Sequence, residues 1–338
     1  MKAIKLQMSS MYGTVGNIDV YRMALEDNLP NIDTAQTMNA GTTGMVRVNA
    51  YMDQIKSGKM GYMAAVKNIR TLIESGISEG DLKTWANMIT DPKKVSKSMM
   101  LPFRFVDAWK AVEGLAVDAF KLKIVKGALE KAFALSAGNT NIAADGEKVA
   151  ILLDESGSMG GMGWGRDTED KKQPWYIGKT LAAAMKVGMD EDKCLFYTWA
   201  DTCTRRDVND MSPFDFISNL TTRGGGTDVS APLQELIRTK TNVDKIIIFT
   251  DLQLYGGWGR GMGDQINTYL KEYKRNVNPD VKVLFWNLQG YSGGAPIDLE
   301  KVQDVFEVAG FSDQMLKVIP RLWSDKNFLI KEINAVEL

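Results

Sequence analysis

The sequence of 338 residues contains no histidine and only two cysteines, Cys194 and Cys203. Without histidine, the chain cannot build a Ser-His-Asp or Cys-His catalytic site, and it cannot bind zinc through imidazole. Two cysteines are too few for a disulfide framework or a thiolate zinc site. Any enzymatic reaction would depend on carboxylates, lysines or a metal ion. We expect a reducing, cytoplasmic setting.

The sequence also lacks long hydrophobic runs, so it predicts neither a signal peptide nor a membrane-spanning helix. Hydrophobic residues make up 44% of the chain and charged residues 25%, as in ordinary globular proteins. The net charge of −1 is divided unevenly, because residues 1–145 carry 18 basic and 14 acidic side chains. This basic excess is compatible with an anionic partner, and a solvated basic surface would explain it equally well.

One short stretch carries a concentration of oxygen ligands. The apolar run 149–153 is typical of a strand buried on both faces. It is followed by Asp154, Ser156 and Ser158, so a carboxylate and two hydroxyls leave the end of the strand together. Oxygen ligands of this kind suit Mg²⁺, Mn²⁺ or Ca²⁺. We therefore expect a cation site here.

The first half of the chain predicts an irregular N-terminal arm over 1–46 and a helical module over 47–140. Apolar residues recur at helical spacing within that module. Joined by short turns, such helices predict a stack of α-hairpins of the HEAT-like repeat type. The four groups are Tyr62, Val66, Ile69 and Ile73; Leu82, Trp85 and Ile89; Phe105, Trp109, Val112 and Leu115; and Phe120, Ile124, Leu129 and Phe133.

Three segments of this module resemble the helical repeats of TROVE-domain proteins, the family of the Ro RNA-binding autoantigen. They are Lys59-Met-Gly-Tyr-Met-Ala-Ala-Val-Lys-Asn-Ile-Arg70, Asp91-Pro92 and Lys97-Ser-Met-Met-Leu-Pro-Phe-Arg-Phe105. The resemblance implies RNA binding through basic side chains, although about 100 helical residues are fewer than the closed ring of that family needs. The candidate phosphate contacts are Lys93, Lys94, Lys97, Arg104, Lys121, Lys123 and Lys126. A solvated helix surface is the alternative explanation for these residues.

After a glycine-rich linker at 136–146, strands and helices alternate. Strands are predicted at 148–153, 193–199, 244–250, 281–288 and 305–308, and helices at 175–185, 214–220, 229–239, 264–275 and 312–322. This alternation predicts a doubly wound, Rossmann-like α/β domain over 147–322 with a C-terminal extension over 323–338. In such sheets, ligands bind at the carboxyl ends of the strands.

Two further loops of this domain supply oxygen ligands. Thr227 follows the glycine turn at 223–226, and Asp251 follows a buried strand. With the Asp-x-Ser-x-Ser loop, they resemble the metal-ion-dependent adhesion site (MIDAS) of von Willebrand factor A (vWA) domains. The resemblance implies that Ser156, Ser158 and Thr227 bind Mg²⁺ (or Mn²⁺ or Ca²⁺) directly. Asp154 and Asp251 would bind directly or through water, leaving one position for an acidic group of a protein partner. A degenerate site that binds nothing is the alternative.

Two glycine-rich loops around this site both contain Gly-Trp-Gly-Arg. Tryptophan and arginine dominate interface hot spots, and they also stack on bases. We therefore expect Trp164, Arg166, Trp258 and Arg260 to form the rim of a partner site. The alternative is that both tryptophans pack inward.

The sequence thus favours a non-enzymatic, cytoplasmic ribonucleoprotein component that binds RNA and recruits a protein through a cation. Catalysis is less expected, because only Glu155 and Asp228 lie beside the ligands as candidate bases. The alternative function is a structural assembly subunit, for example of a virion, that uses both modules for protein contacts. Several copies could then assemble as a homo-oligomer.

Overall fold

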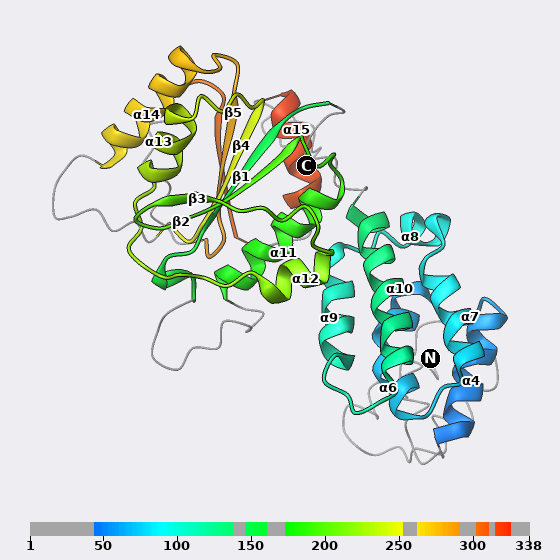
Figure 1. Ribbon diagram of the computed structural model, residues 1–338. Coiled ribbons are helices and arrows are strands. Elements are labelled where there is room, and N and C mark those ends of the chain that lie inside the picture. The colour runs from blue at the N-terminus through cyan, green and yellow to red at the C-terminus, as the bar shows by residue number, and fades with distance from the viewer. Residues whose placement is uncertain are drawn as a thin grey trace, which may run out of the picture. The chain divides into compact units, whose positions relative to one another are not determined.

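The computed structural model describes residues 44–137, 146–160, 173–252, 262–290, 302–310 and 315–325. The chain divides into two compact units, Met1–Ser136 and Ala137–Leu338 (Figure 1). Helices make up the described part of the first unit, and a sheet with flanking helices makes up that of the second. Within the described ranges, no helix has the length and apolar character needed to cross a membrane.

The helical unit is organised around the short helix α5. Its described helices are α4 (Gly44–Lys56), α5 (Tyr62–Lys67), α6 (Ile69–Glu74), α7 (Glu79–Ile89), α8 (Pro92–Ser98), α9 (Pro102–Val112) and α10 (Ala119–Ala137). Helix α5 contacts α6, α7, α8 and α9. The buried Trp85 indole donates to the Ala65 carbonyl at 2.8 Å, and the Tyr62 hydroxyl donates to the Ile89 carbonyl at 2.6 Å. Aromatic side chains thus bind neighbouring helices together through main-chain oxygens.

Three details of the helical unit differ from the sequence prediction. The apolar series from Tyr62 to Ile73 forms two helices, because Asn68 lies between them and its side-chain amide donates to the Ala64 carbonyl at 2.8 Å. Helix α8, whose N-terminus is capped by the Asp91 carboxylate, was not predicted from the sequence. Phe120, predicted on the apolar face, is 48% exposed, with the Lys83 amine 5.9 Å from its ring.

The second unit contains a six-stranded sheet in the order β3-β2-β1-β4-β5-β6. All neighbouring strands pair in parallel except β2 and β3. The prediction of a doubly wound α/β fold is confirmed. The strands are β1 (Val149–Asp154), β2 (Cys194–Trp199), β3 (Cys203–Arg205), β4 (Lys245–Thr250), β5 (Lys282–Asn287) and β6 (Val305–Ala309).

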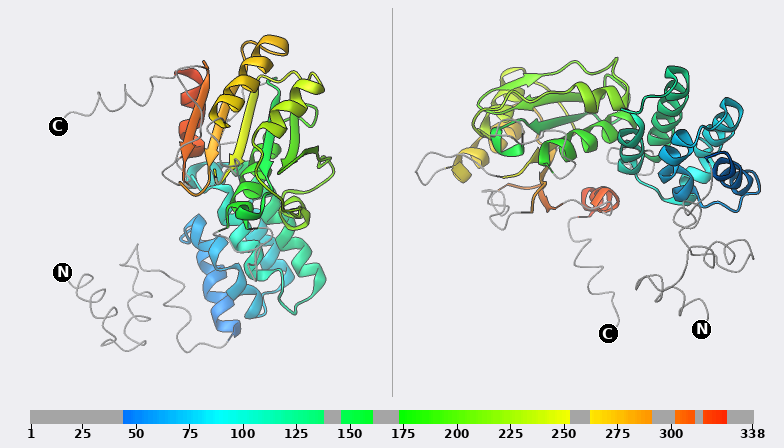
Figure 2. Two further views of the ribbon diagram at one scale, coloured as in Figure 1. Left: turned by 90° about the vertical axis from the view of Figure 1, so that its left-hand side faces the viewer. Right: turned by 90° about the horizontal axis from the view of Figure 1, so that it is seen from below.

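Helices cover both faces of the sheet. On one face, α13 (Ser230–Arg238) and α14 (Met262–Asn276) pack side by side (Figure 2) over a core that includes Leu152, Ile248 and Phe285. The other face is covered by α11 (Pro174–Val187), α12 (Pro213–Asn219) and α15 (Met315–Ser324). There the Trp323 indole packs edge-on against Phe306 of β6. Both faces of the central strands are therefore buried, which explains their continuous apolar sequences.

The largest error in the α/β unit is the missed strand β3. It has only three residues, and it lies at the edge of the sheet, where it pairs in antiparallel with Tyr197, Thr198 and Trp199 of β2. The predicted linker lies mostly outside the described residues, as do most of the predicted N-terminal arm and C-terminal extension. Residues 323 and 324, predicted to begin that extension, belong to α15.

Candidate metal centre

The predicted ligands lie where the sheet topology reverses. From β1 the chain continues to β2 on one side, and after β3 it crosses to β4 on the other side of β1. The reversal therefore lies between β1 and β4, whose carboxyl ends carry Asp154 and Thr250. Asp251 follows directly. This is the edge at which doubly wound sheets bind ligands.

Asp154 is fully buried and is held by two hydrogen bonds. Its Oδ1 accepts from the Ser156 N–H at 2.8 Å, and its Oδ2 accepts from the Thr250 hydroxyl at 2.7 Å. Burial raises the pKa of the Asp154 carboxyl to about 7, and the nearby Asp251 carboxylate adds to this rise. Both hydrogen bonds oppose that shift, but they do not cancel the cost of burying the charge. A cation beside this carboxylate would compensate that cost.

The two serine hydroxyls connect Asp154 to Asp251. Ser156 Oγ and Ser158 Oγ lie 3.2 Å apart, and the Ser158 hydroxyl donates to Asp251 Oδ1 at 3.2 Å. Ser156 and Asp251 are fully buried. Four of the five predicted ligands thus form one cluster. No group of three or more carboxylate or thiol side chains suited to a metal occurs among the described residues. The cluster combines carboxylates with hydroxyls instead.

The fifth predicted ligand, Thr227, lies on a loop attached to this cluster. The Gly157 N–H donates to the Gly225 carbonyl at 3.2 Å, and the Thr222 hydroxyl donates to the Glu155 carbonyl at 2.6 Å. Thr227 is 5% exposed. Among the described residues, no hydrogen bond joins its hydroxyl to the other four predicted ligands. The loop that carries it is therefore fixed to the Asp-x-Ser-x-Ser loop by a backbone hydrogen bond and by the Thr222 hydroxyl.

The two candidate bases, Glu155 and Asp228, have structural partners. Glu155 Oε2 accepts from Arg206 Nη2 at 3.1 Å and from the Arg223 N–H at 3.3 Å. At the start of α13, Asp228 Oδ1 accepts from the Ser230 N–H at 2.9 Å and from the Ser230 hydroxyl at 2.6 Å. These contacts fix the loops around the site, and they do not direct either carboxylate toward the cluster.

Three residues that support the cluster were not predicted from the sequence: Thr250, Asp201 and Arg206. Thr250 binds the Asp154 carboxylate, and Asp201 accepts from the Gly226 N–H at 2.9 Å. Arg206 binds both Glu155 and the buried Thr198 hydroxyl. One signal was available, because Asp201 follows β2 at the same sheet edge as Asp154 and Asp251. The position of Arg206 depends on strand β3, which was not predicted.

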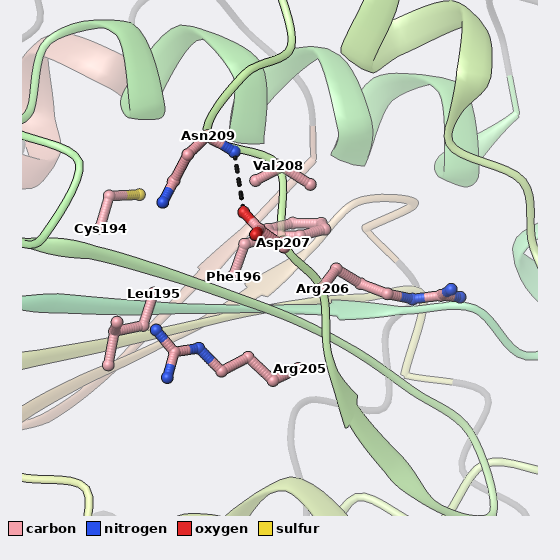
Figure 3. A pocket seen from close by; sticks show the side chains of 8 residues that line it. All are labelled: Cys194, Leu195, Phe196, Arg205, Arg206, Asp207, Val208 and Asn209. Carbon is pink, nitrogen blue, oxygen red and sulfur yellow. Dashed lines mark hydrogen bonds between the residues drawn. The ribbon is translucent and has the colours of Figure 1, made fainter.

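A pocket lies beside strand β2, and Figure 3 shows the eight side chains that line it. Its volume is about 260 Å³, and its lining includes Cys194, Phe196, Arg205 and Arg206. Arg206 is thus shared between this pocket and the Glu155 contact. Burial raises the pKa of the Cys194 thiol to about 11, so this thiol is poorly suited to nucleophilic chemistry near neutral pH.

The candidate RNA contacts lie on three helices of the first unit. Lys93, Lys94 and Lys97 are exposed on α8, and Lys93 and Lys97 share one face because they are four residues apart. The other candidates are engaged in part: Arg104 pairs with Asp107 at 3.9 Å, Lys126 pairs with Glu130 at 3.8 Å, and the Lys121 amine donates to the Ile77 carbonyl at 2.7 Å. Lys123 is exposed on α10. The predicted rim residues Trp164, Arg166, Trp258 and Arg260 lie outside the described residues.

Comparison with known proteins identifies the first part of the chain. Residues 51–155 match the model of the TROVE domain. Over these residues the chain is similar to a TROVE domain. The resemblance predicted from the helical segments is thereby confirmed, and the match extends from α4 through β1 to Glu155. A search of curated protein sequences found no match.

One solved structure has a similar fold. The Ro (RSR) protein of Deinococcus radiodurans is 19% identical, with a TM-score of 0.55 over 91% of this chain and 63% of the Ro chain. At this identity the likeness concerns the fold alone. This chain spans about 63% of the length of that Ro protein.

Two further matches have lower TM-scores. An aerotolerance-related membrane protein of Bacteroides fragilis is 18% identical, with a TM-score of 0.35 over 53% of this chain and 99% of its own. Proximal thread matrix protein 1 of the mussel byssus is 14% identical, with a TM-score of 0.34 over 62% of this chain and 51% of its own.

Proposed function

We propose that this TROVE-domain chain is a non-enzymatic, Ro-like RNA-binding protein whose α/β unit binds a divalent cation. The cation would be Mg²⁺, or Mn²⁺ or Ca²⁺, and it would recruit an acidic group of a protein partner. The observation that carries the cation proposal is the cluster of Asp154, Ser156, Ser158 and Asp251 at the switch point of the sheet. Thr227 would complete the ligand set.

The distances within the cluster fit this proposal. Ligand oxygens at about 2.1 Å from an octahedral Mg²⁺ lie roughly 3 Å from their neighbours. The separations from Ser158 Oγ to Ser156 Oγ and to Asp251 Oδ1 are both 3.2 Å. A cation would replace these hydroxyl contacts with ligand bonds and would favour the ionised form of Asp154. The chemistry supplied by the bound ion is capture of a carboxylate from a partner.

Three observations favour binding over catalysis. The chain has no histidine. Glu155 is held by Arg206, and Asp228 is held by Ser230. A hydrolytic reaction would require a base directed at a water molecule beside the cation. Neither carboxylate is directed in that way, so the site is better suited to adhesion.

Titration calorimetry with Mg²⁺ tests the cation proposal. We expect binding heat for the wild-type chain and none for Asp154→Ala. As a control, Asp192→Ala removes an exposed carboxylate elsewhere in the α/β unit and should retain wild-type binding. Equal heats for the wild-type chain and Asp154→Ala would refute the assignment.

RNA binding is proposed from the TROVE match and from the exposed lysines on α8. A gel shift with a structured RNA should show binding that weakens steeply with salt. Replacing Lys93, Lys94 and Lys97 by glutamine should lower the slope of log K against log salt by about 2–3. A triple variant at Lys59, Lys67 and Lys271 removes the same charge from other exposed sites and should change the slope less. Absent binding of the wild-type chain at low salt would refute this part of the proposal.

Exposed apolar side chains on the helical unit favour a second candidate, a structural assembly subunit. Met45 is 68% exposed, Met99 54% and Phe120 48%. Such side chains can serve protein contacts, including contacts between copies of the chain. Analytical ultracentrifugation separates the two candidates: a defined oligomer without RNA binding would support assembly, and RNA binding by a monomer would support the first proposal.

A further inference from the structure

The loop that carries Thr227 is anchored on both sides of this residue by the turn that follows β2. The Gly226 N–H donates to the Asp201 carboxylate at 2.9 Å, and the Asp228 N–H donates to the Ala200 carbonyl at 3.1 Å. Thr227 lies between these two donors. Two consecutive residues of the turn after β2 therefore fix the backbone on either side of the Thr227 side chain.

The Asp201 carboxylate packs directly onto this loop. A Cβ atom on Gly226 would lie 2.4 Å from Asp201 Oδ1, and one on Gly225 would lie 2.9 Å from Asp201 Oδ2. Gly225 also has a φ of +119°, which side chains rarely adopt. The backbone of Gly226 lies outside the positive-φ region, so the close approach of Asp201 is what excludes a side chain there.

The other half of the loop is anchored differently. Thr222 and Gly225 bind the backbone of Glu155 and Gly157, within the first ligand loop. The Asp201 contact is therefore a link between Thr227 and the end of β2 that is separate from the Asp-x-Ser-x-Ser segment. Asp201 itself is exposed, so its carboxylate is not needed to fill the core.

We propose that Asp201 is a positioning residue for the cation site. Its carboxylate accepts the Gly226 N–H and holds the Gly225–Gly226 turn, so that Thr227 presents its hydroxyl toward the Asp154 cluster. This inference rests on the proposed cation binding by that cluster. Asp201 acts through the loop backbone and not as a ligand, so an acceptor atom at this position is required and a negative charge is not.

Calorimetry with Mg²⁺ on the full chain separates the role of the acceptor atom at Asp201 from that of its negative charge. Asp201→Asn retains an oxygen acceptor for the Gly226 N–H and removes the charge, whereas Asp201→Ala removes both. We expect Asp201→Ala to weaken Mg²⁺ binding by about 10-fold or more, as is typical when groups that support metal ligands are removed. Asp201→Asn should stay within about 3-fold of wild type. Equal losses in both variants, or no loss in Asp201→Ala, would overturn the proposal.

A variant at Gly226 supplies a second test of the positioning role, because Gly226 is the partner of Asp201 in this contact. Gly226→Ala should displace the carboxylate and weaken Mg²⁺ binding about as much as Asp201→Ala does. Because both changes break the same contact, the double variant should lose little more than either single variant. Fully additive losses would contradict a shared role.

Hydrogen exchange without Mg²⁺ keeps the inference testable if the cation proposal fails. In the metal-free chain, Asp201→Ala should speed exchange of the Gly226 amide and leave the β1 and β4 amides unchanged. Unchanged exchange at Gly226 would overturn the positioning role, whatever the wild-type Mg²⁺ result. Missing Mg²⁺ heat in the wild-type chain, with faster exchange in Asp201→Ala, would instead refute the cation site and retain the loop contact. Asp192→Ala is the matched control.

Discussion

Asp154 is a fully buried carboxyl group with a pKa raised to about 7, mainly by burial. Its environment therefore favours the protonated form below about pH 7 in the metal-free protein. Binding a cation requires the ionised form. The buried, ionised carboxylate destabilises the folded chain unless a bound cation compensates its charge. This conflict is typical of functional sites, where local rules of folding are broken.

The first prediction concerns the pH dependence of stability. Because the folded-state pKa of Asp154 lies above its unfolded value, the folded chain binds more protons between about pH 4 and pH 7. Stability from this group is present at low pH and is lost as pH rises through that window. Asp154→Asn should remove this loss and stabilise the metal-free chain at pH 8 by on the order of 2–4 kcal/mol.

Urea unfolding in the presence of EDTA at pH 5 and pH 8 measures this effect. The wild-type chain should lose more stability than Asp154→Asn between the two pH values. A variant with the same pH dependence as the wild-type chain would show that Asp154 does not titrate in this range.

A second prediction at this scale concerns the two thiols. Burial raises the pKa of Cys194 to about 11 and that of Cys203 to about 12. Only the thiolate reacts with iodoacetamide, and its fraction at pH 8 falls about tenfold for each unit of raised pKa. Alkylation in the folded chain should therefore be about 100-fold slower than in denaturant at Cys194 and about 1,000-fold slower at Cys203. Mass spectrometry on Cys194→Ser and Cys203→Ser resolves the two rates, and rapid labelling of the folded chain would contradict the burial of these thiols.

At the scale of elements, the fit between α11 and the sheet depends on Gly178. A Cβ atom there would lie 2.5 Å from Leu153 Cδ1 and 3.2 Å from Leu288 Cδ1. Leu153 immediately precedes Asp154 and is fully buried, so it has little room to move. The close packing of this helix against β1 thus lies next to the candidate site.

The third prediction follows from this packing. Gly178→Ala should destabilise the chain by about 1–3 kcal/mol through overpacking. Gly127→Ala is the matched control, because Gly127 also lies within a helix but has nothing within 4 Å of the added atom. The control should be neutral or stabilising by about 0.5–1 kcal/mol. Urea unfolding followed by circular dichroism compares the two, and equal effects would contradict the packing argument.

The elements that sequence reasoning predicted well are those whose own residues determine them. Strand β4 was predicted within one residue, because a parallel strand buried on both faces leaves a continuous apolar run. Strand β3 was missed because Cys203, Thr204 and Arg205 show no such pattern and pair only because β2 lies beside them. The break at Asn68 depends on one side-chain hydrogen bond within an otherwise helical series.

The same distinction applies to the candidate site. Asp154, Ser156 and Ser158 were predictable as a cluster because they are close in sequence and leave the end of one strand. The contact of Asp201 with Gly226 joins residues 25 positions apart, and it depends on the approach of two loops. The approach of these two loops cannot be predicted from the pattern of residues in a single sequence.

At the scale of the whole molecule, the chain combines two compact units with different expected ligands. The basic side chains proposed for RNA lie on α8, α9 and α10, and the oxygen cluster proposed for a cation lies in the sheet unit. A ligand that binds one folded unit stabilises that unit by mass action. Each ligand should therefore leave a separate signature in the full chain.

The last prediction uses this separation. Mg²⁺ at about 100 times its dissociation constant should stabilise the unit that binds it by about 2.7 kcal/mol. In hydrogen exchange on the full chain, peptides covering 154–158, 222–228 and 250–252 should then be protected, because these segments carry the proposed ligands and their backbone links. Peptides from α4 to α7 should exchange at the same rate with and without Mg²⁺. Protection confined to the helical peptides would place the cation elsewhere, and the same experiment on Asp154→Ala should show no protection in either unit.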